Sequence, residues 1–219
     1  MDISVKKKRT RGRLSREMIE DAAFEVIERE GLSGFSMRKL AAELGCEAMS
    51  IYHHFPSQAH LYEALVDRQI SSIKIPDDGM PWRQRIHVAV KEYRRVATEH
   101  PAFAPFIVVY RMNSPACLAK LNDVIGLFEA GGFGLELSAR LFRATSYYLM
   151  GAILDETAGY AKGPSAVTTV SDEALARDFP RVMAAGAYFG TAGFDKTFDI
   201  GLDMLLDEME RIRDGANAR

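Results

Sequence analysis

A short segment near the N-terminus carries the side chains with the most specific chemistry. Between Glu47 and His53, the apolar positions Ala48 and Ile51 would face a helical core, which leaves the other side chains facing outward. These are short hydrogen-bonding groups, a thioether and an aromatic ring, which suit contacts with base edges, thymine methyl groups and phosphates in a DNA major groove. The predicted DNA-contacting residues on this segment are Glu47, Met49, Ser50, Tyr52 and His53.

Some of these residues have a second interpretation. The Tyr52 ring could pack against the preceding helix instead of contacting a phosphate. His53 and His54 could be taken for a metal-binding pair, but neighbouring residues on a helix point about 100° apart, so they do not share an ion readily. We therefore expect no metal and no cofactor.

Two short helices and a tight turn must position this surface. The second helix of the chain follows Ser36 and stops at Gly45, and the third spans residues 47–53. Ala41 is small where the two helices would cross, and Gly45 can adopt the positive φ of the turn. Because each helix is too short to be stable alone, both are predicted to pack on a longer first helix.

The flanking helices have clear sequence boundaries. Ser15 is a good N-cap for the first helix, and Gly31 lies where a left-handed C-cap is expected. Pro56 prevents the third helix from continuing, and Ser57 caps a fourth helix that runs to Ile70. These elements predict a helix-turn-helix domain at residues 15–75, preceded by a basic arm at residues 1–14.

The arm is the most basic part of the chain. Seven Lys and Arg side chains and one acid lie within residues 1–16, whereas the remainder holds 21 basic and 29 acidic side chains. A cationic arm on an acidic body favours phosphate binding, because each neutralised phosphate releases condensed counterions. We expect Lys8 and Arg11 to contact DNA. Alternatively, the arm is only a solvated end.

The remainder of the chain predicts a second helical domain at residues 81–215. A joint rich in Pro, Asp and Gly at residues 76–81 precedes it, and apolar residues recur at helical spacing with no persistent strand pattern, so the fold is predicted to be all-α. The expected elements are helices at residues 82–100, 101–112, 115–130, 135–160, 173–189 and 194–213, with a loop at residues 161–172.

Aromatic residues are frequent in the second domain. Each one alone is most simply a core residue, but together they could wall an apolar pocket with a few polar groups, as in small-molecule sites. Asp155 follows an apolar stretch and is either a polar group of that pocket or a helix-end carboxylate in solvent. The predicted ligand-binding residues are Tyr93, Phe103, Phe106, Tyr110, Phe128, Tyr147, Met150 and Asp155.

Other functional classes lack their sequence features. The chain has no Gly-rich phosphate loop, no nucleophile elbow and no metal-spaced cluster, so an enzyme is not expected. It also has no apolar run that could cross a membrane, and a cytoplasmic location follows. Cys46 and Cys117 are expected to be small buried thiols. The alternative that stays open is an architectural DNA-binding protein without an effector.

The sequence from Gly34 to Gly45, continued by residues 50–57 and by Leu61 and Leu65, resembles the DNA-binding signature of the TetR family. The resemblance implies that Ser36, Arg38 and Lys39 meet operator DNA together with the third helix. One departure is Gln58, because family members usually carry a lysine near this position to face a phosphate.

The second domain resembles the regulatory domain of the tetracycline repressors, at Trp82 and at residues 129–133, 151–155 and 194–209. Asp155 falls where those repressors have a metal-binding carboxylate, but Ile107 replaces their metal-coordinating histidine. The resemblance therefore implies a metal-free, apolar or aromatic effector that releases a repressor from a palindromic operator.

The resemblance also implies a homodimer formed by the helices around residues 135–160 and 194–213. Two stripes are the expected interface. They consist of Leu141, Ala144, Tyr148, Ala152 and Asp155 on the first helix, and of Phe194, Phe198, Leu202, Leu205, Met209 and Ile212 on the second.

Overall fold

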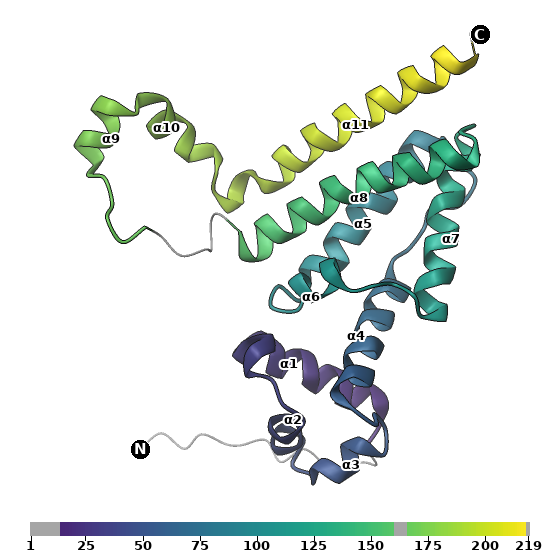
Figure 1. Ribbon diagram of the computed structural model, residues 1–219, viewed down its shortest axis with the longest axis vertical. Helices are drawn as coiled ribbons and strands as arrows, with labels where there is room; N and C mark the ends of the chain where they lie inside the picture. The colour runs from purple at the N-terminus through teal and green to yellow at the C-terminus, as the bar shows by residue number, and fades with distance from the viewer. Residues whose placement is uncertain (1–13, 160–165, 218–219) are drawn as a thin grey trace. The chain divides into compact units, whose positions relative to one another are not determined.

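The computed structural model describes residues 14–159 and 166–217, and within these ranges every regular element is helical, as predicted (Figure 1). The chain forms two compact units, Met1–Ala64 and Leu65–Arg219, which divide inside α4. The α-helices are α1 (Arg16–Gly34), α2 (Met37–Leu44), α3 (Ala48–Tyr52), α4 (Gln58–Ser72), α5 (Trp82–Thr98), α6 (Ala104–Val109), α7 (Pro115–Ala130), α8 (Leu135–Ala158), α9 (Asp172–Asp178), α10 (Pro180–Ala185) and α11 (Phe194–Asn217).

The helix starts in the first unit are set by serine caps. The Ser15 hydroxyl accepts a hydrogen bond from the Met18 amide, and the Ser36 hydroxyl accepts one from the Lys39 amide, each at 3.2 Å. The Ser57 hydroxyl accepts one from the amide of His60 at 3.4 Å. These caps satisfy amides that have no partner inside the helix, so the predicted N-caps are confirmed.

The turn between α2 and α3 depends on Gly45. This residue has φ +65° and ψ +33°, a left-handed conformation that costs a residue with a side chain about 1–2 kcal/mol. The amide of Gly45 donates to the Ala42 carbonyl at 3.2 Å, and the amide of Cys46 donates to the Ala41 carbonyl at 3.0 Å. The two bonds form a Schellman motif, which ends α2 sharply and directs the chain into α3.

Apolar residues of α1, α2 and α3 form the core of the first unit. Ile51 is the buried residue of α3, and Ala41 is buried where α2 meets α3. Gly31 has φ +72°, so α1 bends at the position predicted for its C-cap and continues to Gly34. The other fully buried side chains include Ile19, Ala23, Val26, Ile27, Leu40, Phe55 and Leu61.

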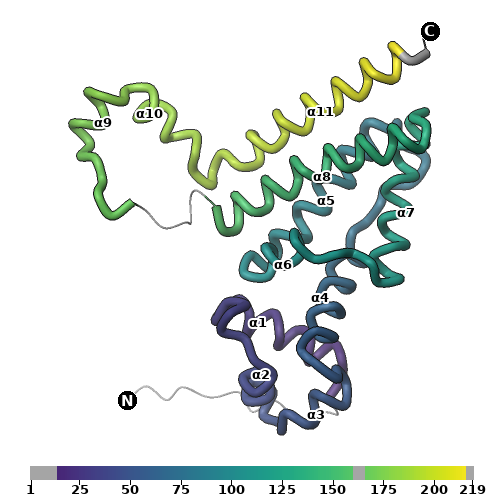
Figure 2. The backbone as a smooth tube through the Cα atoms, in the orientation of Figure 1, coloured from purple at the N-terminus to yellow at the C-terminus, as the bar shows by residue number. Residues whose placement is uncertain are grey.

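In the second unit, α8 packs against α5, α6, α7 and α11, and α8 and α11 run side by side (Figure 2). The Tyr148 hydroxyl donates to the Phe198 carbonyl at 2.7 Å where these two helices meet. A Cβ at Gly201 would lie only 2.4 Å from the same hydroxyl, so the close approach requires glycine there. Arg94 of α5 pairs with Glu156 of α8 and, at 2.8 Å, with Asp195 of α11, which joins the three helices.

Two predicted helices are wrong in extent. The helix expected at residues 101–112 is reduced to α6, because residues 101–103 form a turn closed on the His100 carbonyl and Tyr110 has extended backbone angles. The helix expected at residues 173–189 is broken between α9 and α10 at Phe179. Pro180 disfavours a helical conformation at the preceding residue, and Phe179 has φ −133° and ψ 52°.

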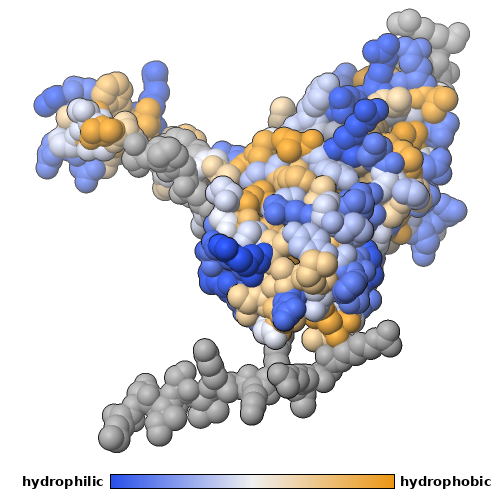
Figure 3. Space-filling view, turned by 60° about the horizontal axis from the view of Figure 1, so that its bottom comes forward, coloured by the Kyte–Doolittle hydropathy of each residue, from blue (hydrophilic) through white to orange (hydrophobic). Residues whose placement is uncertain are grey.

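The remaining boundaries lie close to those predicted. The α8 helix ends at Ala158, and Tyr160, where its end was expected, falls outside the described residues. Neither α9 nor α10 contains a buried residue. None of the helices in the described ranges is both long and apolar enough to span a bilayer. The face seen in Figure 3 mixes hydrophobic and hydrophilic side chains.

Candidate nucleic-acid interface and ligand cavity

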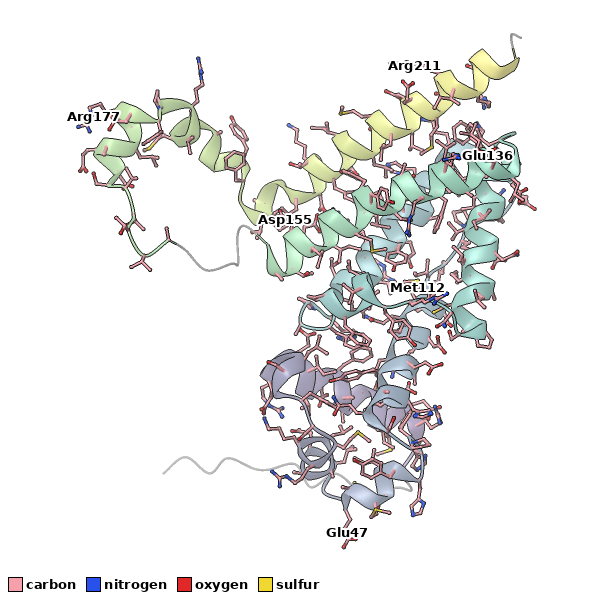
Figure 4. All side chains as sticks on the ribbon, in the orientation of Figure 1. Glu47, Met112, Glu136, Asp155, Arg177 and Arg211 are labelled. Carbon is pink, nitrogen blue, oxygen red and sulfur yellow. The ribbon has the colours of Figure 1, made fainter. Side chains whose placement is uncertain are left out.

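The outward side of α3 has the side chains that the sequence placed there. Ile51 is fully buried, whereas Met49 is 63% exposed and Tyr52 is 39% exposed. Glu47 and His53, at the two ends of the helix, are exposed as well, and Ser50 is half-buried. Figure 4 shows the Glu47 side chain extending away from the other helices of its unit. This short helix therefore presents a mixed polar and apolar edge of the kind that can read a groove.

The residues before and within α2 are engaged to different degrees. The Lys39 ammonium donates to a Glu30 carboxylate oxygen at 2.5 Å and to the Gly34 carbonyl at 2.8 Å. The Ser36 hydroxyl oxygen accepts the hydrogen bond that caps α2, so only its own proton is left to donate to a phosphate. Arg38 is exposed and makes no ion pair within the described part of the chain, which leaves its guanidinium available to a phosphate.

Ion pairs between α1 and α2 hold this region together. Arg29 of α1 donates to Glu43 of α2 at 2.9 Å, and Glu30 pairs with Lys39. The Lys39 ammonium, with a smaller contribution from Arg29, lowers the pKa of the Glu30 carboxyl below its ordinary value. All of these groups are solvent-accessible, so the pairs orient the two helices and add little to the free energy of folding.

Arg16 is a structural residue that the sequence did not single out. Its guanidinium donates to the His54 carbonyl at 2.8 Å and lies 4.2 Å from the centroid of the Phe55 ring. It thereby fixes the first turn of α1 to the segment that follows α3. A basic residue next to a basic arm gave no signal of this role, because the contact joins positions 38 residues apart.

At the start of α4, Gln58 donates from its amide to the Tyr62 hydroxyl at 3.0 Å, within the same helix. The Ser57 hydroxyl lies 2.8 Å from the His60 ring nitrogen Nδ1. The position where family members usually have a lysine thus carries a neutral side chain bound to its own helix. Lys8 and Arg11, the predicted contacts of the arm, lie outside the described residues.

The second unit contains a cavity of about 100 Å³ whose walls come from α4, α5, α7 and α8. Three of the eight predicted ligand-binding residues line it, namely Tyr93, Phe128 and Met150. The remaining lining side chains are almost all apolar. They include Ile70, Ile73, Ile86, Ala89, Val90, Met112, Leu121, Val124, Leu127, Phe142 and Leu149.

The other five predicted ligand-binding residues lie elsewhere. Phe103, Phe106 and Tyr110 stack in sequence at and beside α6, with ring centroids 5.3 and 5.4 Å apart, and do not line the cavity. Tyr147 and Asp155 line a wider surface hollow between α8 and the beginning of α11. Figure 4 shows Asp155 near the C-terminal end of α8, beside the first turn of α11.

Most polar side chains around the cavity already have partners. The hydroxyls of Thr145 and Ser146 each donate to a carbonyl one turn earlier in α8, at 2.8 Å. The Lys120 ammonium donates to the Ile73 carbonyl at 2.6 Å. The Tyr93 hydroxyl differs, because it is buried and has no hydrogen-bond partner within the described residues. Burial raises the pKa of the Tyr93 phenol far above its ordinary value, so the hydroxyl stays protonated.

Hydrogen bonds tie the C-terminal half of α4 to its neighbours. The Ser114 hydroxyl, which also caps α7, donates to the Asp67 carboxylate at 2.5 Å, and the Cys117 thiol lies 3.3 Å from the same oxygen. Lys120 of α7 adds its bond to the Ile73 carbonyl just beyond the end of α4. Hydrogen bonds therefore hold α4, which forms one wall of the cavity, against α7, which forms another.

The predicted dimer stripes are partly wrong. Phe198, Leu202 and Met209 of α11 are at most 2% exposed within a single chain, because they pack on α5 and α8. Leu141 is likewise buried, and the Tyr148 hydroxyl is bound to Phe198. Ala144 and Asp155 of the predicted stripes do remain exposed. The large apolar side chains that are exposed on these two helices were not part of the stripes. They are Leu135, Tyr147 and Leu154 of α8 and Ile200 and Met204 of α11.

Neither cysteine is in a disulfide; Cys117 is buried and Cys46 is half-buried. In the described ranges, no three His, Cys, Asp or Glu side chains are grouped as metal ligands would be. Ile107, which the resemblance places where the tetracycline repressors have a metal-coordinating histidine, is buried.

Comparison with known proteins agrees with this arrangement of helices. The family profile described as "Bacterial regulatory proteins, tetR family" matches residues 19–65, and the profile "Tetracyclin repressor-like, C-terminal domain" matches residues 75–213. An HTH-type transcriptional regulator of Saccharopolyspora erythraea is 28% identical over 207 residues, which cover 93% of this chain and 88% of that protein. The class A tetracycline repressor protein from transposon 1721 of Escherichia coli is 26% identical over 195 residues, 88% of each chain.

A solved structure has the same fold. The Streptomyces coelicolor TetR family protein ActR, in complex with actinorhodin, superposes with a TM-score of 0.69 at 22% identity, over 90% of this chain and 95% of that chain. The two family profiles together span both units of the molecule. The chain therefore belongs to the tetR family of bacterial regulatory proteins and is a transcriptional regulator, not an enzyme.

Proposed function

We propose that this regulator is a repressor that binds a palindromic operator as a homodimer and is released by a small apolar or aromatic effector. The observation that carries the proposal is the position of α4. This helix begins in the unit that presents α3 and ends as a wall of the apolar cavity in the other unit. A change in the cavity can therefore reach the DNA-reading helix along one continuous element.

The DNA-binding half of the proposal rests on the exposed edge of α3. Glu47, Met49, Ser50, Tyr52 and His53 would read base edges, and Arg38 would contact a phosphate. In a two-fold dimer, the two copies of α3 would enter successive major grooves about 34–36 Å apart, which is why the operator is expected to be a palindrome.

The effector half rests on the size of the cavity. Sites for drug-sized ligands usually enclose about 300–1,000 Å³, whereas this cavity holds about 100 Å³. An effector larger than a single ring must therefore move a wall outward. Ile70 and Ile73 belong to the wall that α4 and its end contribute, so a larger occupant displaces the helix that leads to α3. The complex of ActR with actinorhodin supports a ligand-responsive role for this fold.

The surface hollow near Asp155 is wider but less suitable as the effector site. It is lined by α8, by the beginning of α11 and by Tyr188 and Phe189, and no residue of α4 reaches it. An occupant there would have no direct route to α3. Its position on α8 and α11 instead agrees with a role in contact between subunits.

The homodimer would form through α8 and α11. Tyr147 is 68% exposed on α8, and Ile200 and Met204 are 55% and 68% exposed one turn apart on α11. Large apolar side chains exposed in this number on neighbouring helices favour a protein partner. Met204→Glu combined with Ile200→Glu should convert a dimer into a monomer in analytical ultracentrifugation, whereas Arg211→Glu, an exposed change on the same helix, should not.

Binding to DNA that flanks the gene, compared with a scrambled duplex at two salt concentrations, tests the proposal directly. We expect one palindromic site to be preferred and the preference to persist at the higher salt concentration. Equal and steeply salt-dependent binding to both duplexes would favour the architectural alternative instead. A screen for compounds that bind the cavity and weaken operator binding tests the effector half of the proposal. If the protein has no effector, the screen should find no such compound.

A further inference from the structure

Tyr93 lines an otherwise apolar cavity and has an unpaired polar group, its hydroxyl. Its hydroxyl is buried and has no hydrogen-bond partner within residues 14–159 and 166–217. A buried hydroxyl without a partner costs about 1–3 kcal/mol of folding free energy, so such groups are uncommon in folded proteins. A phenylalanine would fill the same space without this cost. The hydroxyl is therefore explained if something in the cavity binds it.

We infer that the effector is a neutral, mainly apolar molecule with one hydrogen-bond acceptor, a carbonyl or ether oxygen, and that the Tyr93 hydroxyl donates to this oxygen. The inference rests on the proposed function in one respect, because it takes the cavity to be the effector site. It goes further by naming the chemistry of the ligand and the residue that selects it.

The other polar groups of the lining narrow the choice of ligand. Thr145 and Ser146 have given their hydroxyl protons to carbonyls of α8, and the Cys117 thiol lies against Asp67. None of these three has a free proton for an acceptor on the ligand, and the charged Lys120 already donates to the Ile73 carbonyl. Among the described side chains of the lining, Tyr93 therefore has the neutral donor without a partner.

Charge disfavours an anionic ligand. Lys120 is the one lining residue with a cationic side chain; it is half-buried and already donates one hydrogen bond to the Ile73 carbonyl. A carboxylate placed among the apolar side chains would lose most of its hydration, a cost that one half-buried ammonium offsets only in part. The Tyr93 phenol stays neutral at physiological pH, because burial raises its pKa, so it acts as a donor and not as a phenolate.

The volume limits the size of a first probe. An engineered apolar cavity of about 150 Å³ in another protein binds benzene, so about 100 Å³ suits a single ring with slight expansion. Acetophenone and α-methylstyrene are a suitable pair, because they have nearly the same shape and differ by a carbonyl oxygen in place of a methylene group. Only the ketone can accept a hydrogen bond from Tyr93.

The experiment compares the two probes on the full-length protein by titration calorimetry, for the wild type and for Tyr93→Phe. The ratio of the two dissociation constants removes effects common to both probes. We expect Tyr93→Phe to reduce the preference for acetophenone by about five-fold, within the range of about 2- to 13-fold for one hydrogen bond. Tyr148→Phe is the matched control, because its hydroxyl donates to Phe198 and does not line the cavity. It should leave the ratio unchanged.

Three results would overturn the inference. These are an unchanged ratio in Tyr93→Phe, binding of neither probe by the wild type, and tighter binding of benzoate than of acetophenone. Failure of the proposed function gives a different pattern. In that case acetophenone binds and the Tyr93→Phe change weakens its binding, but the protein binds no specific operator. Because both variants remove one oxygen without changing the shape of the ring, circular dichroism should show the same helix content in all three proteins.

Discussion

Lys120→Met tests whether the bond between α7 and the end of α4 carries the response to an effector. The Lys120 ammonium donates to the Ile73 carbonyl at 2.6 Å, and both residues line the cavity. Methionine keeps most of the apolar stem and therefore the lining, but it cannot donate a hydrogen bond. The change thus removes one connection between the two walls and leaves the cavity nearly intact.

The size of the effect follows from the environment of the bond. A hydrogen bond from a charged donor contributes about 1.5–3 kcal/mol net, and the contribution is reduced here because Lys120 is only half-buried. We expect the free energy of unfolding to fall by about 1 kcal/mol. If the same bond transmits movement to α4, the coupling between effector and operator falls by a similar amount, about five-fold in affinity.

The assay measures operator affinity with and without saturating effector, and the ratio of the two dissociation constants gives the coupling. Effector affinity is measured separately by calorimetry. Arg140→Met is the control, because Arg140 is an exposed α8 residue whose pairing with Glu136 at 2.9 Å contributes little. The reasoning is refuted if Lys120→Met lowers stability as expected while the coupling ratio equals that of the wild type.

Four further outcomes are expected. Tyr93→Phe should not lower the free energy of unfolding in urea, since its hydroxyl has no partner among the described residues, whereas Tyr148→Phe should lower it by about 1 kcal/mol. Gly45→Ala should cost about 1–2 kcal/mol in the same assay and weaken operator binding, because its φ is +65°. Arg38→Ala should weaken binding to every DNA sequence and reduce the salt slope by about one. Glu30→Gln should change the free energy of unfolding only slightly, because the pair is solvent-accessible. The lowered pKa of Glu30 means that its contribution is present above the unfolded-state pKa and disappears as pH falls through the folded-state pKa. Urea titrations from about pH 6 to about pH 3 should therefore show a slightly smaller acid-dependent loss of stability in the variant than in the wild type.

The first unit could be predicted closely because its signals are local. Ser15 and Ser36 cap helices that start one residue later, and Gly45 forms a turn whose hydrogen bonds span only a few residues. The inward position of Ile51 follows from helical periodicity alone. Arg16 was missed for the opposite reason, since its partners at residues 54 and 55 are brought near only by the fold.

The second unit was harder to predict because tertiary contacts decide which of its side chains are buried, exposed or part of the cavity lining. Periodicity identified the apolar face of α11 but could not say what covers it. Phe198 and Leu202 are covered by the same chain, so the face open to a partner is the one with Ile200 and Met204. Similarly, aromatic composition predicted a cavity but did not distinguish rings that line it from those that stack at α6.

Tyr93 shows what kind of information the sequence lacks. Among the aromatic residues of the second unit, nothing in its neighbours along the chain distinguishes it from Phe128, which lines the same cavity. The distinction appears only when the hydrogen-bond partners of the polar side chains in the lining are compared, because among the described residues the Tyr93 hydroxyl has none. Core packing alone would be served better by phenylalanine at this position, because a hydroxyl adds a desolvation cost with no bond in return. A tyrosine in the wall of a cavity that phenylalanine would fill equally well is most simply explained by what the cavity binds.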